Sequence, residues 1–345
     1  MSMAAKMVRP ASVRLAERLS VGPLALGLGL AAALLAGLML LLAASGDLAR
    51  IVSGEGTIEL GQDFRVGIVL AVMLAFLPAV ELFAIRRAQR ALDELAPVLE
   101  LAAEELDAHR LALARVSRAR NLRAGVIGAT VVMGVFLPEA IVEPVFDPRL
   151  MGALHIAHRV MAAVLGFQAG ASVRLAVRNS RRLGRWAAES GQLDLLDPTA
   201  WAPLARVGLG NAFVSMGVIS LLLLLVPDRD AGVGLAGGLA LLIAASLVMG
   251  GMGLVLPLLP VRARIRAVKQ AELARCNRRI AELRRASAAA GELADAIAYR
   301  GLVDGVSEWP IDVPQLGRFA LVFGLPLASW IAAALVERLI DTAFG

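Results

Sequence analysis

Cysteine, aromatic residues and charge are all scarce in this chain. The single cysteine, Cys276, excludes an intramolecular disulfide and any Cys-x-x-Cys metal motif. Aromatic side chains make up 4% of the residues, with Tyr299 the one tyrosine, so no aromatics are interleaved with the basic residues to stack nucleic-acid bases. The sequence contains no Walker, kinase, nucleophile-elbow or zinc-hydrolase motif. We therefore expect no nucleic-acid partner and no cofactor, and we expect that the protein is not an enzyme.

Apolar residues fill most of the sequence instead, at 58% of all positions, and the mean hydropathy is +0.72. A soluble domain has too little interior to bury so much apolar surface. Charged residues gather in blocks between long apolar runs, which is typical of membrane spans separated by polar loops. Seven runs are long enough to cross about 30 Å of hydrocarbon as helices that rise about 1.5 Å per residue. They cover 23–45, 65–85, 124–142, 150–173, 207–226, 232–259 and 319–336. The sequence therefore predicts an all-α fold, a polytopic transmembrane helix bundle of about seven spans.

The basic residues indicate how this bundle sits in the lipid bilayer. Of the 35 lysines and arginines, 29 lie in the segments 1–22, 86–123, 174–206 and 261–318, whereas the loops on the other side are short and acidic. Positive charge is retained on the cytosolic side of a bacterial inner membrane. We therefore expect a cytosolic N-terminus and, after seven crossings, a periplasmic C-terminus. If the last run lay in the interface instead, the C-terminus would be cytosolic.

The same pattern divides the chain into segments. They are a cytosolic tail at 1–22, four spans at 23–173 with a cytosolic helical extension at 86–123, an interfacial amphipathic segment at 174–206, two spans at 207–260, a cytosolic helical region at 261–318 and a final span with a short tail at 319–345. Spans one to three and five to seven follow the same order of elements, and Arg87–Leu95 resembles Arg264–Leu273. A parallel internal repeat joined by the fourth span is therefore a hypothesis.

Two cytosolic helices, 91–116 and 262–285, carry apolar stripes of coiled-coil-like spacing. The stripes consist of Leu92, Leu95, Leu99, Leu106 and Leu113 in the first helix, and of Leu273, Cys276, Ile280 and Leu283 in the second. We expect Pro97 to kink the first helix early. The two stripes either pack on each other or each pack on their own loop neighbours. Both helices are predicted surfaces for a cytosolic protein partner or for a second copy of the chain.

Ionisable residues inside a span are costly, and four of them gather where spans three and four meet. Glu139 lies near the end of span three, and His155, His158 and Arg159 share one face of span four at matching depth. Three interpretations stay open. The first is a Glu139–Arg159 ion pair that locks the two helices together. The second is a proton-responsive or transport site in which a histidine titrates beside a carboxylate. The third is a metal or haem site on the two histidines, for which Glu143, closer to the interface, could supply a third ligand.

Span six contains Gly234 and Gly238 in a Gly-x-x-x-Gly arrangement. Small residues at this spacing let two helix backbones approach closely. Packing within the bundle and homodimerisation would both use the two glycines, and a bend in the span is a further interpretation.

Two stretches in the C-terminal half are distinctive. One runs from Leu258 to Leu273, and the other combines Trp309-Pro-Ile-Asp with Gly317-Arg-Phe-Ala-Leu and Pro326-Leu-Ala-Ser-Trp330. In these stretches the chain resembles a group of uncharacterised proteobacterial multi-spanning inner-membrane proteins. The resemblance implies a bacterial integral membrane protein, and it implies no activity, substrate or catalytic residue.

Two functional classes remain. The first is a membrane scaffold, sensor or assembly factor that acts through the cytosolic helices. The second is a small transporter or ion channel that uses the cluster between spans three and four. The sequence favours the first class, because polar residues deep in the spans are few and the cytosolic helices are the most distinctive polar feature.

Overall fold

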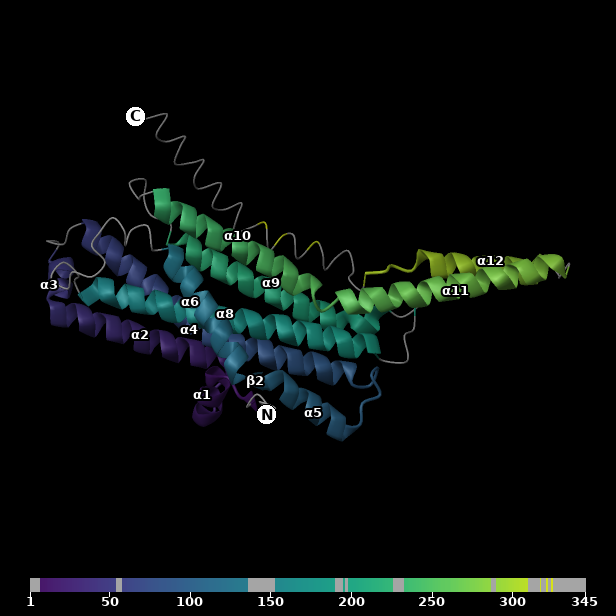
Figure 1. Ribbon diagram of the computed structural model, residues 1–345, viewed down its shortest axis with the longest axis horizontal. Coiled ribbons are helices and arrows are strands. Elements are labelled where there is room, and N and C mark those ends of the chain that lie inside the picture. The colour runs from purple at the N-terminus through teal and green to yellow at the C-terminus, as the bar shows by residue number, and fades with distance from the viewer. Residues whose placement is uncertain are drawn as a thin grey trace, which may run out of the picture.

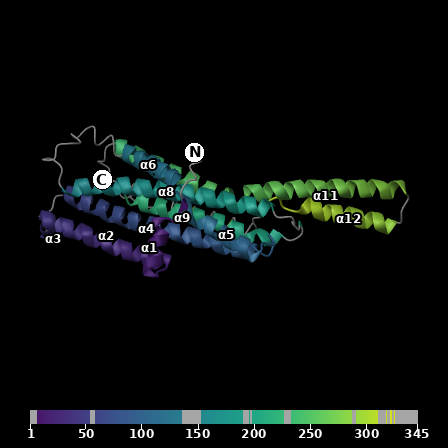
Figure 2. The same cartoon turned by 60° about the horizontal axis from the view of Figure 1, so that its bottom comes forward.

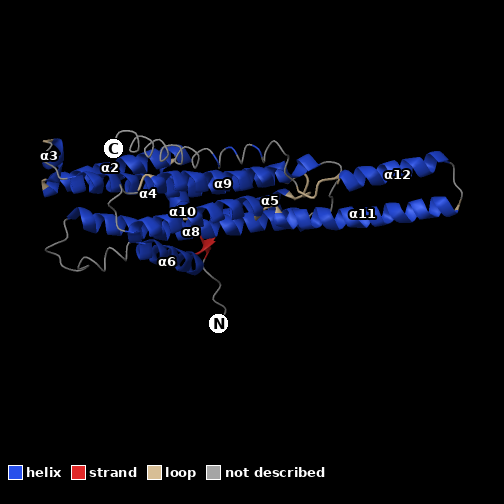
Figure 3. Ribbon diagram, turned by 90° about the horizontal axis from the view of Figure 1, so that it is seen from above, coloured by secondary structure: helices blue, strands red, loops and turns tan. Residues whose placement is uncertain are grey.

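The computed structural model describes residues 7–53, 58–135, 153–189, 195, 198–225, 233–286 and 290–309, together with 317, 321 and 324. Within these ranges the chain is almost entirely helical (Figure 3). The elements are β1 (Met7–Val8), α1 (Ala11–Leu19), α2 (Pro23–Ser45), α3 (Asp47–Val52), α4 (Ile58–Leu95), α5 (Ala103–Ala114), β2 (Val116–Ser117), α6 (Arg118–Val135), α8 (Ala153–Glu189), the 3-10 helix η1 (Pro198–Trp201), α9 (Ala202–Leu223), α10 (Val233–Val255), α11 (Leu259–Arg285) and α12 (Ala290–Gly305). The short strands β1 and β2 pair antiparallel.

Five of the described helices are long and apolar enough to cross a membrane. They are α2, α4 from Phe64 onward, α8 from Ile156 onward, α9, and α10 from Gly237 onward. The prediction of an all-α membrane protein is confirmed. The predicted span 124–142 begins in α6 and ends outside the described residues, and 319–336 lies outside them apart from single positions.

The membrane-length helices form one bundle with α4 at its centre. α4 packs on α2, α8 and α9, while α6 packs on α8 and α10 packs on α9. Glycines bring α6 and α8 close together, since a Cβ added at Gly128 would lie 2.2 Å from the carbonyl oxygen of Gly166. No side chain fits between the two backbones at this point.

The predicted helix 91–116 is not continuous. α4 ends at Leu95, and the chain reverses before α5 begins at Ala103. Pro97 explains the break, because proline has no N–H to donate and disfavours helical backbone at the residue before it. Within the turn, Glu100 adopts a positive φ of 51°.

α5 then folds back onto the end of α4. Arg110 Nε lies 2.7 Å from Asp93 Oδ1, and Gln89 Nε2 donates to the Arg110 carbonyl at 3.2 Å. The hydrogen bonds from Arg110 to Asp93 and Asp107 raise the pKa of the Arg110 guanidinium. The Arg110 guanidinium therefore keeps its positive charge in this ion pair.

The predicted interfacial segment 174–206 is in large part a continuation of the bundle. α8 runs unbroken to Glu189, well past the end of the predicted span 150–173. Its arginines do not all face headgroups, because Arg182 donates to the Ala112 carbonyl at 2.7 Å and Arg178 donates to the Leu113 carbonyl at 2.9 Å. These two side chains satisfy the free carbonyls at the C-terminus of α5.

α11 and α12 form a two-helix hairpin that projects from one end of the bundle (Figures 1 and 2). We call this hairpin the arm. The prediction of a helix over 262–285 is confirmed by α11. α11 packs on α12 and, at its start, on α8, and it does not pair along its length with the stripe of 91–116. Packing on a loop neighbour is therefore the alternative that holds for α11.

Candidate functional site

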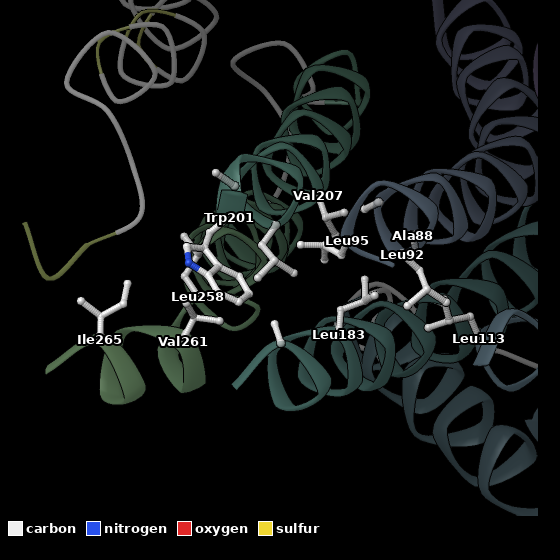
Figure 4. Close-up of a cluster of buried hydrophobic side chains, with 14 residues drawn as sticks. Ala88, Leu92, Leu95, Leu113, Leu183, Trp201, Val207, Leu258, Val261 and Ile265 are labelled. Carbon is white, nitrogen blue, oxygen red and sulfur yellow. The ribbon is translucent and has the colours of Figure 1, made fainter. Parts of the chain in front are cut away.

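The base of the arm is held by a cluster of buried apolar side chains. Trp201 is 2% exposed and lies beside Leu258 and Val261, close to Leu95 and Leu183 (Figure 4). These side chains come from η1, the chain before α11, α11 itself, α4 and α8. The cluster thus joins the first turns of the arm to the helices of the bundle.

The leucines of the predicted stripe on 91–116 belong to the same cluster. Leu92, Leu95 and Leu113 are fully buried in it, and Leu99 and Leu106 pack against it. The leucine stripe of 91–116 therefore packs inside the protein. α11, the other helix predicted to bind a partner, also has its polar face open to solvent.

The contacts between α8 and the arm are tight at Gly184. A Cβ added at Gly184 would lie 2.5 Å from the Pro257 carbonyl oxygen. On the other side of the arm, the Arg262 guanidinium lies 4.3 Å from the centre of the Trp309 ring, and its Nη2 lies 3.9 Å from Glu308. The first turn of α11 is thus held from two sides.

Polar contacts join α12 to α11. Lys269 Nζ donates to the carbonyls of Asp304 at 2.7 Å and Val306 at 2.8 Å, which occupies free carbonyls at the C-terminus of α12. Tyr299 donates to Glu272 at 3.3 Å. Desolvation and the Glu272 carboxylate raise the pKa of the Tyr299 hydroxyl, so the phenol keeps the proton it donates.

The two faces of the arm differ in character. The inner face is apolar, with Cys276, Leu283 and Val303 buried between the two helices. α11 contains nine basic residues and two acidic ones. Seven of its arginines are exposed, namely Arg264, Arg266, Arg275, Arg278, Arg279, Arg284 and Arg285. α11 therefore presents a strongly basic outer face, whereas α12 has three acidic residues and one basic residue.

Few of these charges are neutralised within the described residues. Arg275 lies 3.7 Å from Glu272, and Arg279 lies 4.0 Å from Glu282, with both arginines more than half exposed. Exposed pairs of this kind contribute about 0–1 kcal/mol because solvent screens them. Most of the exposed positive charge of α11 is thus not neutralised by ion pairs among the described residues.

The predicted cluster between spans three and four is only partly described. Glu139 lies outside the described residues, as does the side chain of His155. His158 points at α4 and α2, since its Nε2 would lie 3.0 Å from a Cβ at Gly67, and the Leu38 side chain borders the same point. Arg159 is half-buried one residue further along α8. Among the described residues, no group of three His, Cys, Asp or Glu is placed to hold a metal.

Gly238 serves packing within the bundle. A Cβ at this position would lie 2.4 Å from the Val135 side chain of α6. Of the predicted uses of the glycine pair, internal packing is the one that this contact supports. The surroundings of Gly234 lie outside the described residues.

The bundle also contains a partly open cavity that the sequence did not predict. It measures about 280 Å³ and lies between α4, α8, α9 and α10. Most of its lining is apolar, with Ser180 and Asn211 among the few polar residues, and Asn211 Nδ2 donates to Ser180 Oγ at 3.1 Å. The signal available in the sequence was the presence of these two polar residues within otherwise apolar helices, which did not reveal that they border an open space.

Comparison of the chain with protein-family models, with curated proteins and with solved structures finds no match.

Proposed function

We propose that this chain is a membrane scaffold, sensor or assembly factor that uses the arm to bind an acidic protein surface. The observation that carries the proposal is the exposed basic face of α11, which holds nine basic residues against two acidic ones. A partner with a complementary negative surface would be steered to the arm and oriented on it.

The attachment of the arm supports this function. A docking element has to transmit force or position to the membrane part of the protein, and a loose arm would transmit neither. Here the buried cluster around Trp201 and the close contact of Gly184 with Pro257 join the arm to α8 and α9. A displacement of the arm on binding would therefore be transmitted to the helices of the bundle.

We propose a bacterial inner membrane as the location, with the arm in the cytosol. The supports are the concentration of lysine and arginine on the side of the arm and the resemblance of the C-terminal half to proteobacterial membrane proteins. Seven crossings would follow if 124–142 and 319–336 also span the bilayer. That topology keeps the N-terminus with the arm and puts the C-terminus in the periplasm.

Site-specific photocrosslinking tests the docking function. A photoreactive residue would replace Ala274, which is exposed on the outer face of α11, in full-length protein expressed in a proteobacterial host. We expect discrete crosslinked products that disappear in Arg275→Gln/Arg278→Gln/Arg279→Gln, because that variant removes three of the exposed charges. The products would be sized on gels and identified by mass spectrometry.

A matched control removes the same number of exposed charges elsewhere. Arg14→Gln/Arg18→Gln/Arg123→Gln leaves the arm intact, and the crosslinked products should persist. Products of twice the mass of the chain would identify the acidic partner as a second copy. Absence of any crosslinked product from the arm would contradict the docking function.

The cavity favours a second candidate function, the transport of a small molecule or ion through the bundle. Its lining is mostly apolar and includes one carboxylate, Glu81, so it suits an apolar or amphipathic molecule better than an ion, which would find few polar groups there to replace its hydration. The cavity shares α4 and α8 with the place where His158 meets Gly67 and Leu38, but none of these three residues lines the cavity. Mutations can therefore test the observed cavity separately from the predicted cluster between spans three and four.

Measurements of flux into proteoliposomes distinguish transport through the cavity from transport through the predicted cluster. Ala169→Phe would fill the cavity, whereas Ala240→Phe adds the same side chain on the exposed face of α10. Flux of protons, cations or an apolar dye that is lost only in Ala169→Phe would favour a pathway through the cavity. Loss only in Glu139→Gln and His158→Ala would favour the cluster between spans three and four. No flux above that of empty liposomes would reject transport.

A further inference from the structure

Four arginines gather where α6 begins beside α8. Arg174, Arg178 and Arg182 follow one another at intervals of four residues and therefore share one face of α8. Arg120, in the first turn of α6, lies close enough to repel all three. In the part of the chain that the structure describes, no carboxylate forms an ion pair with any of the four. The cluster is therefore a concentration of positive charge that the described residues do not neutralise.

Close packing of α6 and α8 creates this arrangement. A Cβ at Gly170 would lie 2.1 Å from the Ala124 carbonyl oxygen, so these two residues face each other across the contact. The two helices run antiparallel, so the positions before Ala124 lie opposite those after Gly170. Asn121 and Arg120 consequently lie beside Arg174.

The arginines of the cluster differ in their partners. Arg178 and Arg182 donate to backbone carbonyls at the C-terminus of α5, which accounts for both side chains. Arg174 is different, because its Nη1 is buried and has no hydrogen-bond partner. The same holds for Oδ1 of Asn121 and Oγ of Ser117, which lie at the start of α6. Buried polar atoms are normally paired, and two of these three atoms, Arg174 Nη1 and Ser117 Oγ, can donate hydrogen bonds to an anionic group, whereas Asn121 Oδ1 is an acceptor and Asn121 can donate only through Nδ2.

The junction lies at the edge of the apolar surface. Beyond it along α6, Leu122, Val126 and Ile127 are all more than half exposed, as expected of side chains that face lipid. Before it, Arg118 and Arg120 are exposed to solvent. This edge is the depth at which phosphate groups of lipid headgroups reside.

We propose that Arg120 and Arg174 bind a phosphate group, with Ser117 and Asn121 completing the site. A planar guanidinium offers two parallel N–H donors to phosphate oxygens, and the serine hydroxyl and the asparagine amide supply further donors. Arg178 and Arg182, which donate hydrogen bonds to α5, add to the positive electrostatic potential at the site. The phosphate belongs either to the headgroup of an anionic phospholipid or to a free phosphate ion.

Binding to defined probes tests the site. Full-length protein in detergent would be titrated with phosphatidylglycerol, with phosphatidylcholine and with inorganic phosphate, and bound ligand would be counted by native mass spectrometry. We expect retained phosphatidylglycerol, and we expect Arg174→Gln to weaken its binding about tenfold, as for loss of one charged hydrogen-bonding partner. Competition by inorganic phosphate would identify the free ion as a ligand, and its failure to compete would identify the lipid headgroup.

The matched control is Arg123→Gln, one helical turn along α6. Arg123 is exposed and is not among the charges that act on Arg174, so binding should stay at the wild-type level. Arg120→Gln provides a second variant on an exposed side chain, in case Arg174→Gln does not fold. Equal losses in Arg120→Gln and Arg123→Gln would show a general positive surface and overturn the site, as would absence of binding to all three probes.

Discussion

Gly184 of α8 stands so close to Pro257 that a Cβ on the glycine would lie 2.5 Å from the proline carbonyl oxygen. Pro257 lies between α10 and α11, at the point where the chain leaves the bundle and enters the arm. A glycine at this contact lets α8 touch the connecting backbone directly. The direction of the arm is therefore set by a helix that is distant in sequence.

Gly184→Ala should change that direction. The added methyl group cannot fit, so the backbone at Pro257 has to move, and overpacking of this kind costs about 1–3 kcal/mol. We expect a lower thermal unfolding temperature and a changed distance between spin labels placed on the arm and on α5. Gly251→Ala is the control, because nothing lies within 4 Å of a Cβ at Gly251. Equal unfolding of the two variants would contradict a tight contact.

Trp201→Ala should loosen the base of the arm. The Trp201 side chain is 2% exposed, and removal of a buried tryptophan costs about 3–5 kcal/mol through lost burial and the cavity left behind. Hydrogen exchange should accelerate in the first turns of α11. Leu302→Ala, at a side chain that is 63% exposed, should change stability by less than about 0.5 kcal/mol. Unchanged exchange in α11 after loss of Trp201 would show that the cluster does not hold the arm.

Lys269→Gln should open the C-terminal end of α12. The charged amine donates to two carbonyls, and hydrogen bonds of a charged group contribute about 1.5–3 kcal/mol. We expect faster hydrogen exchange around Asp304 with little change at the start of α12. Arg275→Gln removes a charge from an arginine side chain that is 76% exposed and should leave exchange unaltered. Equal exchange in both variants would argue against the capping contact.

Gly170→Ala should separate α6 from α8. A methyl group at Gly170 would lie 2.1 Å from the Ala124 carbonyl oxygen, and helix backbones in contact cannot relax without moving apart. We expect a thermal unfolding temperature below that of the wild type by several degrees, which corresponds to about 1–3 kcal/mol. Gly134→Ala on α6, where a Cβ would meet nothing within 4 Å, should unfold like the wild type. An unchanged unfolding temperature in Gly170→Ala would refute the close approach.

The membrane helices could be predicted from the sequence because hydropathy is a local property. The run 23–45 coincides with α2 in both limits, and 207–226 and 232–259 overlap α9 and α10. The break at Pro97 was also partly foreseen, since proline acts on its immediate neighbours. The reversal that lays α5 back on α4 was not, because it depends on contacts such as that of Arg110 with Asp93.

For the candidate sites, too, local sequence predicts some features and tertiary contacts determine the others. Periodicity located the apolar face of 91–116 correctly, but it did not reveal that Leu92 and Leu95 lie in the buried cluster that contains Trp201. The sequence predicts an interfacial segment at 174–206, whereas Arg182 of that segment binds the carbonyl of Ala112 within the protein. In both cases the sequence shows which face of a helix is apolar or charged and leaves its neighbour undetermined.

Hydropathy along the chain is enough to identify an α-helical membrane protein, because long apolar helices satisfy their backbone hydrogen bonds within each segment when they cross hydrocarbon. The pattern of residues over 262–285 likewise predicts a basic, amphipathic helix. The pairing of this helix with α12, the packing of Gly184 and Trp201 at its base, and the proximity of Arg120 to Arg174 follow from the tertiary structure. Those contacts join residues far apart in the chain, and they depend on how side chains of particular size fill the space between helices, which spacing along one helix does not encode.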